Sequence, residues 1–412
     1  MNSQADNQAS GNTPNGALHG IKVLDLTAVM LGPLATQILG DYGAEVIKVE
    51  NISGDVMRAN GTSRTRGMGS IFLNVNRNKK SIALDLKTDK GKEVLKRLIA
   101  ASDVLVHNMR VDAIERLGFG YAAVSGIKND IVYCAATGFG QSGPYANKPS
   151  LDDTILAECG FLGLGGAGGS RPEYPPTLLA DKTAAMALVN ATLAALLHKE
   201  RTGRGQYVEV PMFETLVAYT LAEHLGGLTF EPALGKPGYA RLMEGGRRVS
   251  PTSDGYVAIL PYSGTHWIEF FKAAGRSDLL EKHSLADRHY VNANMDSLYA
   301  SLAEITRQKT SAECLAVCGA LDIPAAPIND IEDLIDHPHL KAVGLFSLSE
   351  HPTEGSVRYV MPPTRFSESP ASIRSHAPLL GQHTREILSG LGLADDEIEA
   401  LQSQGITSQS AR

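Results

Sequence analysis

The first third of the chain alternates short apolar runs with segments of helical spacing. Residues 21–26 and 44–49 are apolar runs of strand length, and residues 34–42 between them have the spacing of an amphipathic helix. Gly32-Pro33 precedes this helix, where proline suits the first helical position. The pattern predicts a strand–helix–strand unit whose first strand leads directly to a helix N-terminus.

A second unit of the same kind follows. An apolar run at residues 81–86 precedes a helix with an apolar face between Val94 and Ile99. Residues 103–106 form the next apolar run, and residues 131–137 form another. Strands that alternate with helices predict an α/β domain with a largely parallel sheet.

The pattern changes after about residue 230. Residues 229–250 carry scattered glycine and proline without a clear period, so we expect a long crossing segment there. A strand at 256–260 and several helices up to about residue 340 predict a second, smaller α+β domain. Residues 346–366 are strand-like again, and residues 393–402 are expected to form a final helix.

Composition and charge exclude some classes of partner. The chain has 412 residues, of which 43% are hydrophobic, as in ordinary globular proteins. Its net charge of −7 provides no bulk basic field for nucleic acid or an anionic membrane. The polar N-terminus indicates no signal peptide or membrane span. The four cysteines predict neither a disulfide framework nor a metal site, which suits a cytoplasmic location.

One carboxylate follows the predicted strand at 131–137. A turn at residues 138–144 ends this strand, and Asp152 comes shortly afterwards. Ligands of open α/β sheets bind outside the carboxyl ends of the strands, so a carboxylate delivered there is placed for chemistry. Asp152 is also a suitable N-cap for the apolar run 155–157, which is the common use of such a residue. From the residues alone both interpretations stay open.

Several polar residues are candidates for binding an anionic ligand. The run Asn-Arg-Asn-Lys-Lys at 76–80 lies just before a predicted strand, and it suits a solvated face and a polyphosphate site equally. His107 and Asn108 end a strand, where binding residues often lie. Arg116, on the following helix, is within reach of the same crevice, or it pairs with a surface acid such as Glu115.

A second basic group lies in the crossing segment. Arg241, Arg247 and Arg248 flank Gly245 and Gly246. Flexible basic loops of this kind often grip acidic substrates. A solvated loop is an equal alternative.

The run Gly-Leu-Gly-Gly-Ala-Gly at 163–168 fits the G-x-G-x-x-G pattern of dinucleotide sites. A helix-like run rather than a strand precedes it, and Pro175-Pro176 interrupts the helix that would receive a pyrophosphate. We therefore interpret the run as a mobile cover near Asp152, because glycine lets the backbone approach a reacting group closely.

Seven motifs occur in order between about residue 18 and residue 395. They lie at residues 20–50, 76–81, 115–118, 138–144, 202–206, 323–327 and 377–383. Together they resemble the class III CoA-transferases, the family of formyl-CoA transferase and the carnitine CoA-transferase. Each motif alone is modest, but the set of seven is highly specific.

The resemblance implies an α/β fold: a Rossmann-like large domain with a parallel sheet, built from both ends of the chain, and a smaller α+β domain. It also implies an interlocked homodimer. The expected boundaries are a disordered tail at 1–17, the first part of the large CoA-binding domain at 18–227, a linker and small domain at 228–340, a return to the large domain at 341–405, and a tail at 406–412. The implied partners are an acyl-CoA and a small carboxylic acid, not nucleic acid or a membrane. Coenzyme A enters as a thioester substrate, and no permanently bound cofactor is expected.

The resemblance also assigns site residues. The family's nucleophilic aspartate falls on Asp152. Its coenzyme A contacts fall on Val29, Met30, Leu31, Asn76, Arg77, Lys79, Asn108, Met109 and Arg116. Gly245, Gly246, Arg241, Arg247 and Arg248 remain candidates for an acyl-binding loop.

The chain departs from the family pattern at three places. Asn51-Ile52 stands where the family often has a basic residue, which puts one phosphate contact in question. The usual acid-Asn-Phe-Arg-Pro-Gly run is His-Asn-Met-Arg-Val-Asp at 107–112, so adenine packing is expected to differ. Leu151 stands where the related α-methylacyl-CoA racemases have a catalytic histidine, paired with an aspartate that matches Asp181.

The third departure favours transfer over racemisation. A racemase needs an acid/base group on each face of the α-carbon, whereas a transferase needs only a carboxylate nucleophile. The sequence therefore predicts a class III CoA-transferase that works through an aspartyl anhydride and an aspartyl-CoA thioester on Asp152, with a dicarboxylate such as succinate as a candidate substrate. Backbone N–H groups of the glycine-rich segments are expected to stabilise the oxyanions. A racemase-type isomerase and a CoA-binding homologue without turnover are the alternatives.

Overall fold

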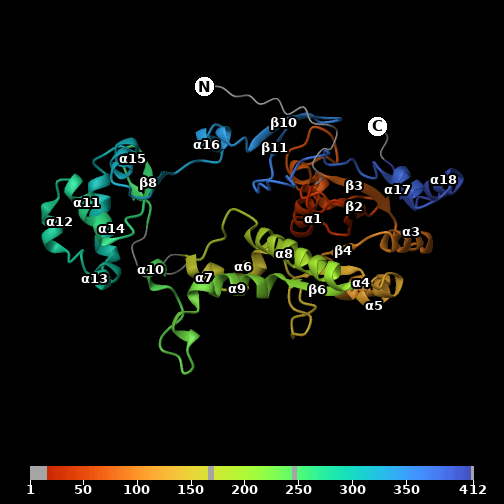
Figure 1. Cartoon of the computed structure of the whole chain (residues 1–412), viewed down its shortest axis with the longest axis horizontal. Helices are drawn as coiled ribbons and strands as arrows, with labels where there is room; N and C mark the ends of the chain where they lie inside the picture. The colour runs from red at the N-terminus through yellow and green to blue at the C-terminus, as the bar shows by residue number, and fades with distance from the viewer. Residues whose placement is uncertain (1–15, 166–170, 244–247, 410–412) are drawn as a thin grey trace. The chain divides into compact units, whose positions relative to one another are not determined.

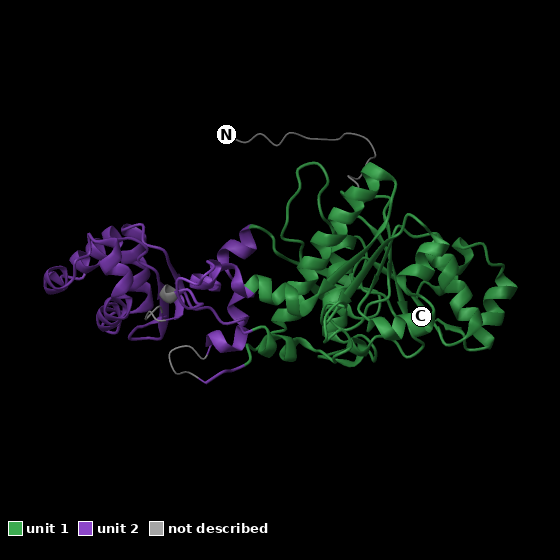
Figure 2. Ribbon diagram, turned by 90° about the horizontal axis from the view of Figure 1, so that it is seen from below, with its two compact units in different colours: residues 1–159, 174–219, 343–412 green, residues 160–173, 220–342 purple. Residues whose placement is uncertain are grey.

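The computed structural model describes residues 16–165, 171–243 and 248–409. The chain divides into two compact units (Figure 2). Unit 1 comprises residues 1–159, 174–219 and 343–412, and unit 2 comprises residues 160–173 and 220–342. The large domain is thus built from both ends of the chain.

A seven-stranded sheet forms the centre of unit 1, in the order β12-β3-β2-β1-β4-β5-β6 (Figure 1). Its strands are β1 Lys22–Asp25, β2 Glu45–Glu50, β3 Lys79–Leu84, β4 Val104–His107, β5 Val132–Thr137, β6 Gln206–Pro211 and β12 Thr407–Ser408. β1 to β6 run parallel, and β12 is antiparallel to β3. The order 3-2-1-4-5-6 is that of a Rossmann-like fold, whose topological switch point lies between β1 and β4.

Helices cover both faces of this sheet (Figure 2). Those of unit 1 are α1 Leu31–Asp41, α2 Ser70–Val75, α3 Asp89–Ala100, α4 Val111–Leu117, α5 Tyr121–Ile127, α6 Asp152–Glu158, α8 Leu179–Thr202, α17 Thr384–Gly390 and α18 Asp395–Ser403. The apolar face predicted for residues 94–99 is buried in the core, as its helical spacing indicated.

The C-terminal segment completes the sheet of unit 1. It enters through the antiparallel hairpin β10 Phe346–His351 and β11 Gly355–Val360. Ile406 and Thr407, expected in a tail, are buried, and the Thr407 hydroxyl donates a 2.6 Å hydrogen bond to the carbonyl of Ala83. The tail boundary therefore needs correction, because β12 pairs with the free edge of β3.

Unit 2 has its own helical core and a small antiparallel sheet. Its elements are α7 Phe161–Gly165, α10 Ala240–Met243, α11 Gly264–Ala273, α12 Ser277–Lys282, α13 Arg288–Ala293, α14 Met295–Thr306, α15 Ser311–Ala320 and α16 Pro338–Ala342, with β7 Ser250–Pro251, β8 Tyr256–Ile259 and β9 Ala325–Pro327. Trp267, Phe271 and Leu298 are fully buried at its centre, and Cys314 and Cys318 pack beside them as free thiols.

Helix α8 is long and apolar enough, by length and composition, to cross a membrane. Its packing explains this composition differently. α8 contacts α1, α6, β5 and β6, and Ala184, Leu188 and Val189 on this side are buried. Met186 and Leu197 on the other side are half exposed, so α8 is buried on one face only. α9, Met212–His224, follows β6.

Candidate active site

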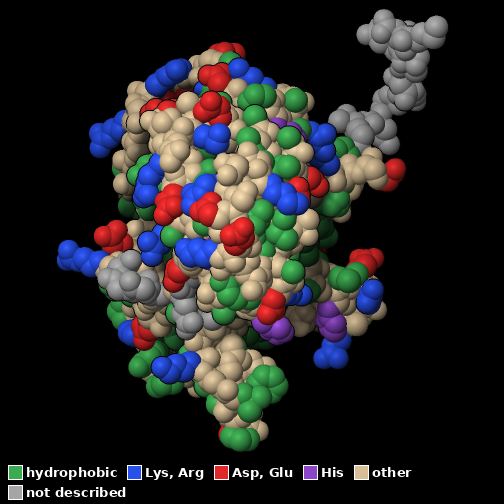
Figure 3. All heavy atoms as spheres, turned by 90° about the vertical axis from the view of Figure 1, so that its left-hand side faces the viewer, with side chains coloured by type: hydrophobic (Ala, Val, Ile, Leu, Met, Phe, Trp, Pro, Cys, Tyr) green, Lys and Arg blue, Asp and Glu red, His purple; other side chains and the backbone are tan. Residues whose placement is uncertain are grey.

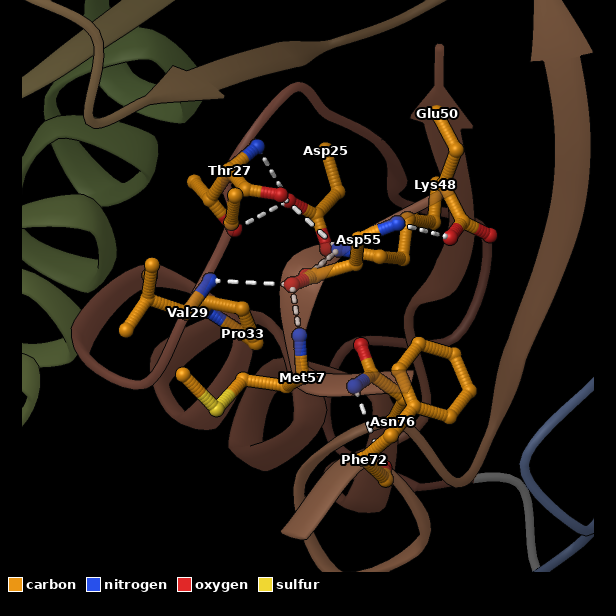
Figure 4. A network of polar contacts seen from close by, with 12 residues as sticks. Asp25, Thr27, Val29, Pro33, Lys48, Glu50, Asp55, Met57, Phe72 and Asn76 are labelled. Atoms are coloured by element: carbon orange, nitrogen blue, oxygen red, sulfur yellow. Dashed lines mark hydrogen bonds and ion pairs between the residues drawn. The ribbon is translucent and has the colours of Figure 1, made fainter. Parts of the chain in front are cut away.

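A buried ionic network lies beneath the carboxyl ends of β1, β2 and β3 (Figure 4). Asp25, the last residue of β1, accepts hydrogen bonds from the hydroxyls of Thr27 and Thr36. It forms an ion pair with Lys79 at 3.0 Å, and Lys48 forms another with Asp55 at 3.0 Å. Burial alone would raise the pKa of Asp25, but the charges of Lys79 and Lys48 lower it to about 2. The network is therefore charged at neutral pH and is internally compensated.

Lys79 was predicted to contact coenzyme A, and its position requires a correction. β3 begins at Lys79 rather than at residue 81, so this side chain points into the interior toward Asp25 of β1 and Pro33 of α1 instead of lying in a loop. All three N–H donors of its ammonium are used, by Asp25, by the Pro33 carbonyl at 2.9 Å and by Asn76 at 2.9 Å. No donor remains for a phosphate.

Asn76 and Arg77, from the same predicted group, are also engaged internally. Arg77 is 6% exposed and holds Asp41 through two hydrogen bonds of 3.0 and 2.7 Å. Asn76 is fully buried and donates to the carbonyl of Phe72. In this structure Asn76, Arg77 and Lys79 of the basic run stabilise the fold, whereas Lys80 is partly exposed and pairs with Glu45 and Glu386.

Above the network lies a cavity of about 1030 Å³, entirely within unit 1. Residues that follow β1, β2 and β3 line it, including Ala28, Asn51 and Lys87. Met109, after β4, and Leu379-Leu380 of the C-terminal segment complete the wall. The cavity thus opens at the carboxyl ends of the strands beside the switch point, where ligands of this fold bind. Met109 is the predicted CoA contact that lines it.

The loop at residues 53–69 forms one side of this cavity and is firmly attached. Arg58 binds Glu50 at the end of β2 through two 2.7 Å hydrogen bonds and donates to the Pro378 carbonyl. Its guanidinium also lies over the Phe72 ring, 3.7 Å from the centroid. Sequence reasoning missed this loop, which brings Arg66 to the cavity, and it also missed Lys87. Both lie outside the motifs with recognisable chemistry.

The loop after β1 is held in an unusual conformation. Val29 has φ = 74°, a left-handed value that is rare for a β-branched residue and is often found at functional sites. Asn108 fixes this loop by accepting from the N–H of Ala28 at 2.9 Å and donating to its carbonyl at 2.8 Å. The Val29 N–H donates to Asp55 at 3.3 Å. Met30 and Leu31, the next two predicted contacts, are the N-cap and first residue of α1.

Arg116 lies on α4, the helix that follows β4. Its side chain is 67% exposed and pairs with Asp112 at 2.7 Å, one turn earlier. The neighbouring Leu117 lines the cavity, whereas Arg116 does not. Its contact with coenzyme A therefore stays a prediction.

Asp152 lies at the start of α6, beyond the carboxyl end of β5. It does not cap its own helix, because Leu151 is the N-cap and the hydroxyl of Thr154 bonds with the backbone of Leu151. The Asp152 carboxylate instead reaches the first turn of α8, where Oδ2 accepts a 2.8 Å hydrogen bond from the N–H of Asp181. This N–H has no partner within the helix, so the contact satisfies it.

The environment of Asp152 perturbs two carboxyl groups. Asp152 is 5% exposed, and its Oδ1 has no hydrogen-bond partner among the described residues. Burial raises its pKa above the ordinary value, and backbone N–H groups of α8 oppose the rise. Burial, followed by the charge of Asp152, raises the pKa of Asp181 to about 6. The fold thus orients a buried carboxylate that has one bound oxygen and one without a partner among the described residues.

The predicted acyl-binding loop is largely beyond what the structure describes. Gly245, Gly246, Arg247 and the side chain of Arg241 lie outside the described residues. Arg248 is exposed at the end of the gap. Within the glycine-rich run, Gly166 to Gly168 are likewise outside the described residues.

Comparison with known proteins decides the family. Residues 18–384 match the family described as CoA-transferase family III. The chain belongs to this family. It is 32% identical to human succinyl-CoA:glutarate CoA-transferase, over 95% of this chain and 90% of the relative. It is 33% identical to the succinyl-CoA–L-malate CoA-transferase beta subunit of Chloroflexus aurantiacus, over 96% and 99%. It is 32% identical to formyl-CoA:oxalate CoA-transferase of Escherichia coli, over 93% and 98%.

Solved structures agree with this assignment. A CAIB/BAIF family protein from Brucella suis aligns with a TM-score of 0.79 and 30% identity, over 92% of this chain and all of the other. Rv3272 from M. tuberculosis aligns with a TM-score of 0.80 and 28% identity, over 91% of this chain and all of the other. The predicted α/β fold and family are confirmed, and the protein is a class III CoA-transferase whose substrates are CoA thioesters.

Proposed function

We propose that this CoA-transferase moves CoA from an acyl-CoA to a carboxylic acid through covalent intermediates on Asp152. The observation that carries the proposal is the state of this carboxylate. It is buried, its Oδ2 is bound by the N-terminus of α8, and its Oδ1 is buried without a hydrogen-bond partner among the described residues. Covalent catalysis needs such an oriented nucleophile.

The first half of the reaction releases the donor acid. Oδ1 attacks the thioester carbonyl, the C–S bond breaks, and an anhydride with Asp152 forms while CoA leaves as a thiolate. The thiolate then attacks the Asp152 carbonyl carbon of this anhydride. The donor carboxylate departs with its electron pair, and Asp152 becomes a CoA thioester. No proton has to be supplied in either step.

The second half reverses the sequence with the acceptor. The acceptor carboxylate attacks the Asp152 thioester and expels the CoA thiolate, which gives a second anhydride. The thiolate then attacks the acceptor's carbonyl, so that the new acyl-CoA leaves and the Asp152 carboxylate is regenerated. Whenever the Asp152 carbonyl carbon becomes tetrahedral, its oxyanion corresponds to Oδ2. The Asp181 N–H at 2.8 Å and the positive end of α8 are suited to stabilise it.

The cavity above the ionic network is the proposed site for the nucleotide end of coenzyme A. It adjoins the ends of β1, β2 and β3, whereas Asp152 follows β5. The order β2-β1-β4-β5 puts about three strand spacings, roughly 14 Å, between the two places along the same sheet edge. An extended pantetheine arm matches such a separation. The nucleotide therefore lies at one end of the edge and the thioester at the other.

A dicarboxylate substrate is proposed on two grounds. The relatives described above are named for succinyl-CoA, glutarate, L-malate and oxalate, all of which contain or derive from dicarboxylic acids. Arg241, Arg247 and Arg248 lie together in this chain, and a guanidinium is a forked donor suited to a second carboxylate.

An interlocked homodimer is also proposed. Large hydrophobic side chains are exposed along α9 and the crossing segment that follows it: Tyr219, Leu221, Leu225, Leu228, Phe230, Leu234, Tyr239 and Leu242. Figure 3 shows hydrophobic side chains on a lobe at the lower end of its face, among interspersed charges. Exposed apolar surface of this extent is typical of a protein–protein interface.

The test is a matrix of acyl-CoA donors and carboxylate acceptors, with product thioesters separated by chromatography. Succinyl-CoA with glutarate, malate and oxalate should give new thioesters, and the Asp152→Ala variant should give none. Exchange of the substrate α-proton with deuterated water, without transfer, would instead support the racemase alternative. Leu151, at the position of the racemase histidine, argues against that outcome because it has no titratable group.

A further inference from the structure

The cavity contains four cationic side chains, and only two of them are open to a ligand. Lys48 and Arg58 are buried and bind Asp55 and Glu50. Arg66 and Lys87 are exposed at the rim. No hydrogen bond or ion pair joins either of these two side chains to another described residue. The buried cations are neutralised by the protein, so an anionic ligand in the cavity has Arg66 and Lys87 as its available partners.

The backbone around Arg66 is fixed on both sides. Arg64 donates to the carbonyl of Glu354, and the Thr65 N–H donates to the Glu354 carboxylate at 3.1 Å. Glu354 is 3% exposed and lies in the turn between β10 and β11. Met68, two residues after Arg66, is fully buried, and its N–H donates to the Thr65 carbonyl. The guanidinium therefore extends from a backbone that is already ordered, which lowers the entropy lost on binding.

The position of Arg66 along the sheet edge selects one phosphate group. The pantetheine arm must run toward Asp152, on the β4–β5 side of β1. Arg66 is on the loop after β2, and Lys87 follows β3, on the opposite side of β1. In coenzyme A the pyrophosphate leads into the pantetheine arm, whereas the ribose 3′-phosphate lies at the other end of the molecule. Arg66 and Lys87 both therefore belong to the end of the cavity away from Asp152, and Arg66 is the one whose backbone is fixed on both sides.

We propose that Arg66 binds the 3′-phosphate of coenzyme A and thereby selects coenzyme A over 3′-dephospho-coenzyme A. The inference rests on the proposed function, which puts the nucleotide in this cavity. Asn51, which lines the same cavity, carries no charge, so the cation on this part of the wall comes from Arg66 on the neighbouring loop. Its planar fork suits a terminal phosphate, which offers three oxygens.

The experiment measures the dissociation constants of coenzyme A and 3′-dephospho-coenzyme A by calorimetry for four proteins. These are the wild type, Arg66→Gln, Lys87→Gln and Arg358→Gln. Arg358 is exposed on β11, does not line the cavity, and controls for the loss of one positive charge. The wild type should prefer coenzyme A by about tenfold or more, as expected for one charge-assisted phosphate contact.

Arg66→Gln should lose most of this preference, because it weakens the binding of coenzyme A but not of 3′-dephospho-coenzyme A. Arg358→Gln should keep the preference. Equal preference in the wild type and Arg66→Gln would overturn the inference, as would loss of preference in Lys87→Gln but not in Arg66→Gln. Either result leaves the proposed function standing. A wild type that binds neither nucleotide and turns over no acyl-CoA would instead refute the proposed function itself.

Discussion

The backbone N–H of Asp181 donates a 2.8 Å hydrogen bond to one carboxylate oxygen of Asp152. This contact joins the start of α6 to the start of α8, two helices of the connection between β5 and β6. It fixes the orientation of Asp152 and leaves its second oxygen without a partner among the described residues. In the proposed mechanism the same N–H faces the oxyanion on the Asp152 carbonyl, so one hydrogen bond would serve both the resting state and the covalent intermediates.

Replacing the nucleophile should abolish transfer without unfolding the protein. Asp152→Asn keeps the size and the hydrogen bond to α8 but removes the nucleophilic carboxylate, so kcat should fall by at least about a thousandfold. Asp153→Asn is the matched control, because Asp153 is the exposed next residue. Steady-state rates with succinyl-CoA and glutarate measure the effect. Loss in Asp153→Asn but not in Asp152→Asn would move the nucleophile to the neighbouring position.

The raised pKa of Asp181 makes a prediction about stability and pH. Its pKa in the folded protein is about 6, against an ordinary value of 3.8. Because the pKa of this carboxyl group is higher in the folded protein, protonation of Asp181 stabilises the folded state. That contribution is fully present below about pH 3.8 and is lost as the pH rises through about 6. At pH 8, ionisation of Asp181 therefore costs up to about 3 kcal/mol.

Asp181→Asn should consequently be more stable than the wild type at pH 8, and the gain should disappear near pH 4. Urea unfolding at both pH values measures it, with Asp153→Asn as the exposed control. The substitution retains the backbone N–H that holds Asp152. A variant with the same stability difference at both pH values would show that the Asp181 carboxyl does not titrate in this way.

Lys79 and Lys80 are neighbours in β3 with opposite surroundings. Lys79 is fully buried against Asp25, whereas Lys80 is partly exposed between Glu45 and Glu386. Lys79→Met should lower the free energy of unfolding by about 3–5 kcal/mol, because it breaks a buried network. Lys80→Met should lower it by less than about 1 kcal/mol. If Lys79→Met were as stable as Lys80→Met but bound coenzyme A poorly, the ammonium would contact the ligand after all.

The proposed interlocked homodimer predicts that dissociation requires unfolding. Interlocked chains cannot separate while both stay folded, so the unfolding midpoint should rise with protein concentration. Analytical ultracentrifugation at low micromolar concentration should detect a dimer only. A folded monomer in that experiment would contradict the interlocked arrangement.

Periodicity in the sequence predicted the strands of the first half of the sheet, the helix that carries Val94 and Ile99, and the α/β fold, because burial of an apolar face depends on local spacing. The predicted start of β3 was two residues too late, and this error put Lys79 in a loop. A charge run before a strand cannot be told from a charge run inside it when the partner, Asp25, lies 54 residues away. The strand at 407–408 was missed because two polar residues carry no period, and only the edge of β3 makes them a strand.

The candidate site likewise contains residues that the sequence predicted and residues that it did not. Asp152 was proposed from its place after a strand and from the family motif, but its contact with the first turn of α8 was not predicted. Asn108 and Met109, predicted contacts of coenzyme A, follow the end of β4, and their role stays a prediction. Arg66 was missed, since the loop at 53–69 has no period and its place is set by Glu50, Pro378 and Glu354. Contacts between residues about 300 positions apart leave no local trace in a sequence.

The most direct test of the account is to trap CoA on Asp152. The enzyme is incubated with succinyl-CoA, treated with hydroxylamine, digested, and analysed by peptide mass spectrometry. Hydroxylamine attacks the aspartyl thioester, expels CoA and leaves a hydroxamate on the side chain. We expect this modification on Asp152, dependent on succinyl-CoA and absent from the Asp152→Asn variant. Full turnover with an unmodified Asp152, or a hydroxamate on another residue, would contradict covalent catalysis by Asp152.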